Sequence, residues 1–271
     1  MAGQRELLAS RPGRPRLRAP GARNWSSTCR LWFTGVAVLL VGAVAGCSSG
    51  AAVPPTRTPS SARASGGSLQ FLPGQGHGFV AIPAGTYWVV VQGASAARPF
   101  PVVRVPVGFA GGGFAVDAVS VPGAAVAPDA RGLAFWGVQG VFTNPCTAGK
   151  HAVDPGPSVS DLARALATQP LRSGTAPVPV TVAGYQGLYV ETSVPAHIDF
   201  TKCKDGYFDS WTSSNGGGRF QQGPGQKDRL WILNVHGYRL VIDGWHMPAA
   251  TQQQINQITE MVKTLTFQTT S

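Results

Sequence analysis

Two β-type segments near the C-terminal end, joined by His236-Gly237, constrain the fold more than any other feature of the sequence. The segments Leu230–Val235 and Tyr238–Trp245 are rich in aliphatic, β-branched and aromatic residues. A two-residue connection that contains Gly favours a primed turn, because glycine accepts a positive φ without steric cost. The pattern therefore predicts an antiparallel hairpin.

This turn sets the register of the hairpin, and the register separates two faces. The pairs on the apolar face are Trp231 with Ile242, Leu233 with Leu240, and Val235 with Tyr238. The pairs on the other, mixed face are Leu230 with Asp243, Ile232 with Val241, and Asn234 with Arg239. We therefore expect a central hairpin with a helix over its apolar side.

Two amphipathic helices are predicted, each with a capping signal. The first covers Val159–Gln169 after Ser158, with Asp161 three residues on, and the second starts near Thr251, with Gln254 in the same relation. Apolar residues at helical spacing form their expected buried stripes: Val159, Leu162, Ala163 and Leu166 in the first, and Ile255, Ile258, Val262 and Leu265 in the second.

Further short β-rich runs are broken by Gly and Pro. They are Thr86–Gln92, Phe100–Val105, Phe114–Val119, Leu133–Val138, Pro179–Val182 and Leu188–Val194, with a loop expected over Thr143–Pro157. Runs of strands with two helices predict an α+β fold around a mainly antiparallel sheet, with the two amphipathic helices packed on it. A hairpin followed by a C-terminal helix resembles PsbP-like domains, a likeness that concerns the fold alone.

The positive charge of the chain is concentrated before residue 47. The formal net charge is +10, yet residues 1–46 hold seven Arg against Glu6, and Arg57 and Arg63 add two more charges. Residues 68–271 hold 13 basic and 11 acidic side chains without a Lys/Arg run. This distribution argues against a nucleic-acid partner for the domain.

Arg30 is followed by sixteen uncharged residues, 31–46, and then by Cys47. A basic region, a short apolar region and terminal small residues are the parts of a secretory signal. Sixteen residues make a helix of about 24 Å, short for a bilayer core of about 30 Å. An uncleaved single span and an ordinary secretory signal are the alternatives.

The residues Val44-Ala45-Gly46-Cys47 resemble the lipobox of bacterial lipoproteins. That resemblance implies diacylglyceryl attachment to the Cys47 thiol and cleavage between Gly46 and Cys47. It also implies that the protein is anchored to the cell membrane at its outer, extracytoplasmic face. Two or three acyl chains hold a protein much more firmly than one.

Three regions follow from these patterns. Residues 1–46 form the signal peptide, and 47–67 form the lipidated Cys and a tether of mostly Ser, Gly, Ala, Pro, Thr and Arg that we expect to be disordered. Residues 68–271 form a single ectodomain. Several strings in it resemble a group of uncharacterised extracytoplasmic actinobacterial proteins: Asn144-Pro145-Cys146, Asp154-Pro155-Gly156-Pro157, Gly223-Pro224-Gly225-Gln226, Arg229-Leu230-Trp231-Ile232 and Val241-Ile242-Asp243.

Two cysteines remain in the ectodomain, Cys146 and Cys203. An even number of cysteines in an oxidising compartment favours a disulfide. The alternative is a zinc site, because His151 follows Cys146 and His197 precedes Cys203 at short spacing. The spacings match no standard zinc finger, so we expect the disulfide, no metal and no cofactor.

No catalytic motif stands out, and no catalytic residue is assigned. His236, Asp243 and His246 form a tempting set, but His236 and His246 lie about 30 Å apart along one strand. Weak ligand candidates are Asp199, Asp205, Asp209 and Trp211. The sequence favours a binding or interaction module that takes a small ligand or an envelope protein. A cell-envelope hydrolase using the Asp199–Asp209 loop and a structural protein without a ligand are the alternatives.

Overall fold

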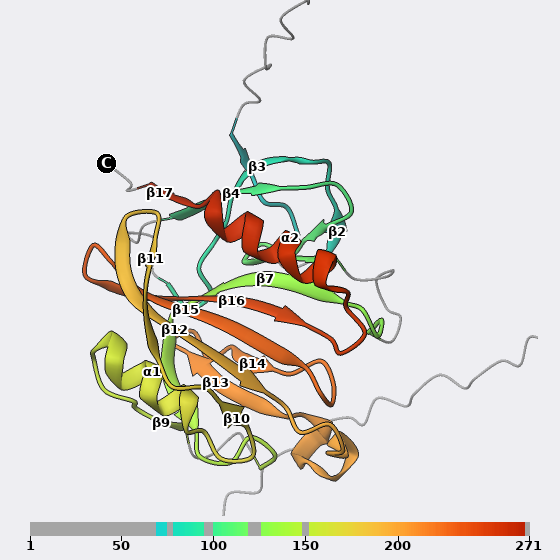
Figure 1. The fold of residues 1–271 in the computed structure, drawn as a ribbon, viewed down its shortest axis with the longest axis vertical. Coiled ribbons are helices and arrows are strands. Elements are labelled where there is room, and N and C mark those ends of the chain that lie inside the picture. Colours follow the sequence, from blue (N-terminus) through green and yellow to red (C-terminus); the bar gives the residue numbers. More distant parts are fainter. Residues whose placement is uncertain (1–68, 75–77, 95–99, 119–125, 148–151, 269–271) are drawn as a thin grey trace, which may run out of the picture. The chain divides into compact units, whose positions relative to one another are not determined.

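The computed structural model describes residues 69–74, 78–94, 100–118, 126–147 and 152–268 (Figure 1). These residues belong to one unit, which runs from Ala62 to Ser271. The signal peptide and the whole tether predicted from the sequence, with Gly46 and Cys47, lie outside the described residues. Within the described ranges, no helix has the length and apolar character needed to cross a membrane.

A nine-stranded, antiparallel sheet forms the centre of the fold. Its order is β10-β12-β15-β16-β7-β6-β5-β2, and β11 pairs with the outer side of β12. The bounds are β2 Val80–Ala81, β5 Ala110–Gly111, β6 Ala115–Ala118, β7 Arg131–Trp136, β10 Ser173–Gly174, β11 Val178–Val182, β12 Tyr185–Ser193, β15 Lys227–Val235 and β16 Tyr238–His246. The predicted hairpin is β15–β16, in the middle of this sheet.

The hairpin register is the predicted one. Trp231 pairs with Ile242, and Leu230 pairs with Asp243 on the other face. His236 and Gly237 both have positive φ, 52° and 81°, as a primed turn requires. The turn residues and the alternation of side chains therefore determine which residues of β15 and β16 face each core.

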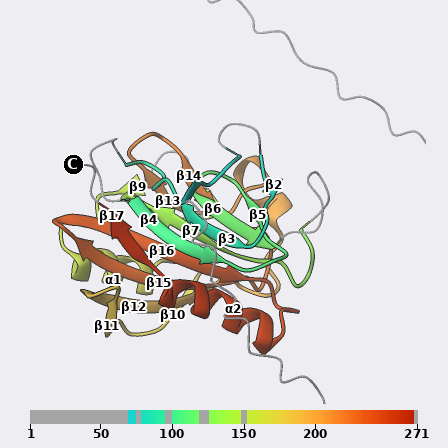
Figure 2. The ribbon, with the colours of Figure 1, turned by 90° about the horizontal axis from the view of Figure 1, so that it is seen from above.

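The apolar face of the hairpin packs against α2 (Gln252–Lys263) and a four-stranded sheet. That sheet has the order β1-β3-β4-β17, with β1 Gln70–Phe71, β3 Gly85–Trp88, β4 Phe100–Val105 and β17 Thr266–Gln268. Leu233 and Leu240 share one core with Ile258 and Val262 of α2. Thr251 and Gln254 form the predicted capping box of this helix. Figures 1 and 2 show α2 lying along the central sheet.

The mixed face of the hairpin packs against α1 (Val159–Ala167) and a second four-stranded sheet. This sheet has the order β14-β13-β8-β9, with β8 Val138–Phe142, β9 Ala152–Val153, β13 Asp209–Ser213 and β14 Gly218–Phe220. Ile232 and Val241 share a second core with Leu162 of α1 and Trp211 of β13. The fold is thus α+β, with one helix over each face of a mainly antiparallel sheet.

The third sheet departs most from the sequence expectations. Strands β13 and β14 were not predicted, because Asp209–Ser213 and Gly218–Phe220 are short and polar, and β9 lies inside the expected loop Thr143–Pro157. The predicted strand Thr86–Gln92 ends at Trp88, and the first helix ends at Ala167 rather than Gln169. Two 3₁₀ turns, η1 (Phe200–Lys202) and η2 (Lys204–Gly206), precede β13.

Candidate functional site

A row of residues across the central sheet forms the base of the candidate site. Asp117 of β6 pairs with Gly132 of β7, which pairs in turn with Trp245 of β16. Trp245 pairs with Asp228 of β15, so all four positions face the same side of the sheet. A Cβ atom on Gly132 would come within 1.9 Å of Asp117 Oδ1 and 2.6 Å of Trp245 Nε1. Glycine thus leaves room beside the Asp117 carboxyl for the Trp245 indole, which favours the charged form of that carboxyl and so lowers its pKa.

Arg219 of β14 reaches this row from the third sheet and links two carboxylates. Its Nε donates to Asp243 Oδ2 at 2.6 Å, and its Nη2 donates to Asp228 Oδ1 at 3.3 Å. Its Nη1 donates to the backbone oxygen of Phe220 at 2.8 Å. The guanidinium carbon lies 5.7 Å from the centroid of a Trp245 ring. Because this side chain is only 6% exposed, water screens its ion pairs little.

Arg172, immediately before β10, is the second arginine of the group. Its Nη2 donates to Asp228 Oδ2, and its Nη1 donates to Ser210 Oγ at 2.5 Å. Gln226 Nε2 adds a bond to Asp228 Oδ1 at 2.7 Å. Asp228 therefore accepts hydrogen bonds from three side chains, although its own side chain is fully buried. We call Asp117, Asp228, Asp243, Arg172 and Arg219 the ionic cluster.

The ionic cluster has three acids and two bases, which leaves it one positive charge short when every group is ionised. Burial raises the pKa of Asp117 to about 7, and the Arg219 guanidinium opposes this rise. Burial also raises the pKa of Asp243 to about 7 against the same guanidinium, with Asp228 adding repulsion. An exposed aspartate ionises near pH 4. The cluster therefore takes up a proton close to neutral pH, which removes its net charge.

A cavity of about 100 Å³ lies beside Asp117. Its aromatic lining consists of Phe79, Phe114, Trp136, Phe220 and Trp245, and its polar side chains are Asp117, Arg219 and Gln222. The rings of Phe114 and Trp136 pack edge to face at 5.0 Å between centroids. A cavity needs only about 10–15 Å³ by this measure to hold one water, so this one has room for a small group of several non-hydrogen atoms.

Two residues that line this cavity each have a buried polar atom without a partner. Among the described residues, Asp117 Oδ1, Asp243 Oδ1 and Trp136 Nε1 are buried and accept or donate no hydrogen bond. Buried polar groups are nearly always bonded, and each exception calls for an explanation. Asp117 and Trp136 both line the cavity, so two residues with an unused polar atom meet at its wall.

A larger groove of about 910 Å³ runs between α2 and the β3–β4 strands. It is lined by residues such as Arg104, Gln257 and Glu260. Within the described part of the chain, none of the buried unpartnered side-chain atoms lies in its lining. Size alone therefore favours the groove, whereas the convergence of unused polar groups favours the smaller cavity.

The structure places the four ligand candidates from the sequence at the 3₁₀ turns and in strand β13. Asp199 caps η1, because its Oδ1 accepts from the Thr201 N–H at 3.0 Å and the Thr201 hydroxyl at 2.6 Å. Asp205 is exposed in η2, and Asp209 begins β13. Trp211 is fully buried and packs edge to face on Trp136 at 5.9 Å, so it belongs to the core.

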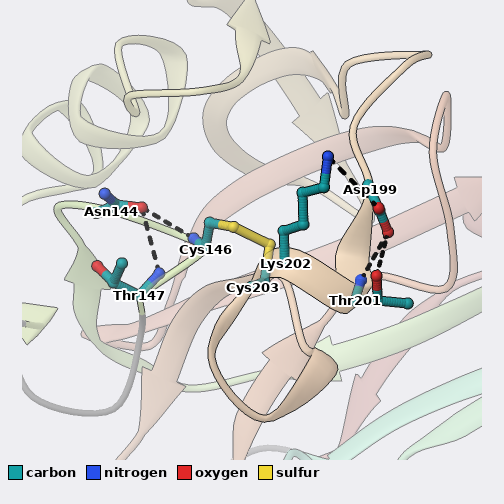
Figure 3. Close-up of a disulfide and its surroundings, with 7 residues drawn as sticks. All are labelled: Asn144, Cys146, Thr147, Asp199, Thr201, Lys202 and Cys203. Atoms are coloured by element: carbon teal, nitrogen blue, oxygen red, sulfur yellow. Dashed lines mark hydrogen bonds and ion pairs between the residues drawn. A yellow bond between two sulfur atoms is a disulfide. The ribbon is translucent and has the colours of Figure 1, made fainter.

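The predicted disulfide between Cys146 and Cys203 is present, with the two Cα atoms 4.5 Å apart (Figure 3). Both thiols are therefore consumed, which contradicts the zinc alternative, and His151 lies outside the described residues. Nor do the described residues contain a group of three or more His, Cys, Asp or Glu side chains placed to hold a metal ion. The bridge joins the loop after β8 to the 3₁₀ turns, and Asn144 Oδ1 accepts from the Cys146 N–H at 3.0 Å.

The ionic cluster was not predicted from the sequence, although one signal for it exists. Asp117 and Asp243 are single acids inside the apolar runs Phe114–Val119 and Tyr238–Trp245. An isolated acid on the buried side of a strand needs a partner, and the partner Arg219 comes from the unpredicted strand β14. His236 lies at the hairpin tip, within 2.6 Å of the Tyr185 hydroxyl, and takes no part in the cluster.

Comparison of the chain with family models, with curated proteins and with solved structures yields no match.

Proposed function

We propose that this protein is a lipid-anchored, extracytoplasmic binding module whose domain holds a small ligand in the cavity beside Asp117. The observation that carries the binding function is the Asp117 carboxyl, which has no ion pair of its own within the ionic cluster, in the aromatic lining of that cavity. Cavities with apolar walls and a few converging polar groups are the usual form of small-ligand sites.

The chemistry of the cavity favours binding over hydrolysis. The carboxyl that faces it is Asp117, while the Arg219 nitrogens already donate within the protein. The acids of the Asp199–Asp209 loop, on which the hydrolase alternative depended, serve as a helix cap, an exposed turn residue and the first residue of a strand. We therefore favour a binding module over a cell-envelope hydrolase.

The anchor is supported by the lipobox pattern and is tested by substitution. In a bacterium that processes lipoproteins, the wild-type protein should incorporate radioactive palmitate, fractionate with the membrane and begin at Cys47. Cys47→Ala should lose the label and keep its leader. Cys29→Ala is the matched control and should behave as wild type. Palmitate labelling of the Cys47→Ala protein, or cleavage of its leader at residue 46, would refute the anchor.

The binding function is tested with probes of four or five non-hydrogen atoms: ethanolamine, ethylene glycol and glycolate. The ¹⁵N-labelled indole N–H groups of Trp136 and Trp245 report on the cavity, and Trp→Phe substitutions assign their signals. We expect at least one probe to shift these two signals in the full-length, detergent-solubilised protein. If no probe shifts either signal, the cavity holds no small polar ligand and the proposed binding function fails.

A further inference from the structure

The charges around Asp117 define what can occupy the cavity. The charged groups that face this carboxyl are Arg219 of β14 and Asp243 of β16. Arg219 pairs with Asp243 and Asp228, and Arg172 pairs with Asp228. Three carboxyls therefore share two guanidiniums, and Asp117 is the acid without an ion pair of its own in the ionic cluster.

Asp117 also lies where an added charge can enter. It is 7% exposed, and it is the acid in the lining of the cavity. Phe79 and Phe114 are half-buried at that lining, and Phe220 is 47% exposed. Aromatic rings attract cations through their negative faces, and the attraction grows when water is excluded.

An anionic occupant fits these groups poorly. Arg219 is the cation in the lining, and its Nε, Nη1 and Nη2 each donate to an acceptor within the protein. The ionic cluster has a net charge of −1 when all of its groups are ionised. An anion would add a second negative charge to this buried cluster. A cation instead neutralises the group and replaces the proton that it otherwise takes up.

We propose that the cavity binds a primary ammonium group as the counterion of Asp117. This inference rests on the proposed function, since it names the chemical class of the ligand for the same cavity. The ammonium pairs with the Asp117 carboxyl, and the short carbon chain that carries it packs against the aromatic rings of the lining. The cavity has room for such a group, which has about four non-hydrogen atoms.

The test compares ethanolamine with two probes of nearly the same size, ethylene glycol, which is neutral, and glycolate, which is anionic. Each is titrated into the full-length protein at pH 8, with the indole signals of Trp136 and Trp245 as the readout. We expect the Kd for ethanolamine to be at least tenfold lower than that for either other probe. If ethylene glycol or glycolate binds as tightly as ethanolamine, the ammonium inference is overturned while the binding function stands.

Substitution of Asp117 isolates the charge. Asp117→Asn keeps the shape of the side chain, and we expect it to weaken ethanolamine at least tenfold and ethylene glycol less than threefold. Asp205→Asn removes an exposed acid at a residue with φ of 58°, a conformation that Asn accepts, and should leave both affinities unchanged. Wild-type affinity for ethanolamine in the Asp117→Asn protein overturns the inference.

The pH dependence supplies a readout that a merely structural Asp117 would not move. Because burial raises the pKa of Asp117 to about 7, the ammonium competes with a proton below that pH. Ethanolamine remains protonated throughout, so its Kd should be about tenfold higher at pH 6 than at pH 8. An equal Kd at the two values overturns the assignment of Asp117 as the partner of the cation.

Discussion

Replacement of Asp117 by Asn should make the protein more resistant to alkaline pH. In the folded state the Asp117 carboxyl is buried beside Asp243, and its pKa rises to about 7. In the unfolded chain it ionises near pH 4. The folded protein therefore prefers the protonated form, and the stability contributed by this group is greatest in acid and falls as the pH rises toward 7.

The size of the effect follows from the two pKa values. Each unit of difference corresponds to 1.36 kcal/mol, so the loss of unfolding free energy from pH 5 to pH 8 is about 2.5 kcal/mol. Asn carries no charge, and it leaves two acids against two arginines in the ionic cluster. Asp243, whose pKa burial also raises to about 7, still titrates in both proteins. The loss of about 2.5 kcal/mol should therefore appear in the difference between the wild type and Asp117→Asn over this range.

Urea unfolding of both proteins, followed by tryptophan fluorescence at pH 5, 6, 7 and 8 without reductant, measures this difference. The free energy of the wild type should fall relative to that of Asp117→Asn, most steeply below pH 7. Asp205→Asn should follow the wild type. Parallel curves for wild type and Asp117→Asn would refute the argument that Asp117 holds a proton in the folded protein.

Three further substitutions test the cluster and its support. Arg219→Met should lower the unfolding free energy by about 3–5 kcal/mol in urea titrations, because it leaves buried carboxylates unpaired; a loss below 1 kcal/mol would contradict a buried pair. Gly132→Ala should abolish the Trp136 and Trp245 indole shifts caused by ethanolamine, because the new methyl group would overlap Asp117 Oδ1. Cys146→Ser should remove about 4 kcal/mol, since the bridge closes a loop between residues 57 apart, and an unchanged melting temperature would exclude a stabilising bridge.

The central hairpin could be predicted because its pattern is local. His236-Gly237 fixes the turn, and strict alternation then assigns each residue of β15 and β16 to a face, as the register Leu233 with Leu240 confirms. Both helices carry capping boxes and apolar stripes within a single segment. In these elements, residues a few positions apart contain all of the information that was needed.

The candidate site could not be predicted because its pattern is not local. Arg219 lies in a three-residue strand whose neighbours are Gly and Phe, and nothing within that segment indicates burial. Its partner Asp243 is 24 residues away, and Arg172 meets Asp228 across 56 residues. Such pairings depend on how the third sheet packs on the central one. The short-range periodicity of the sequence carries no information about that packing.

The ionic cluster differs from an ordinary group of ion pairs in its charge, and this difference supports a functional interpretation. Arg229 and Glu191 lie 3.5 Å apart elsewhere on the central sheet, and this pair matches one acid with one base in a partly exposed position. Such a pair contributes little to stability and needs no occupant. The cluster instead buries a carboxyl that has no base of its own, at a free-energy cost near neutral pH. Acids with shifted pKa values beside a cavity are typical of functional sites. An ammonium ligand would offset this free-energy cost when it binds.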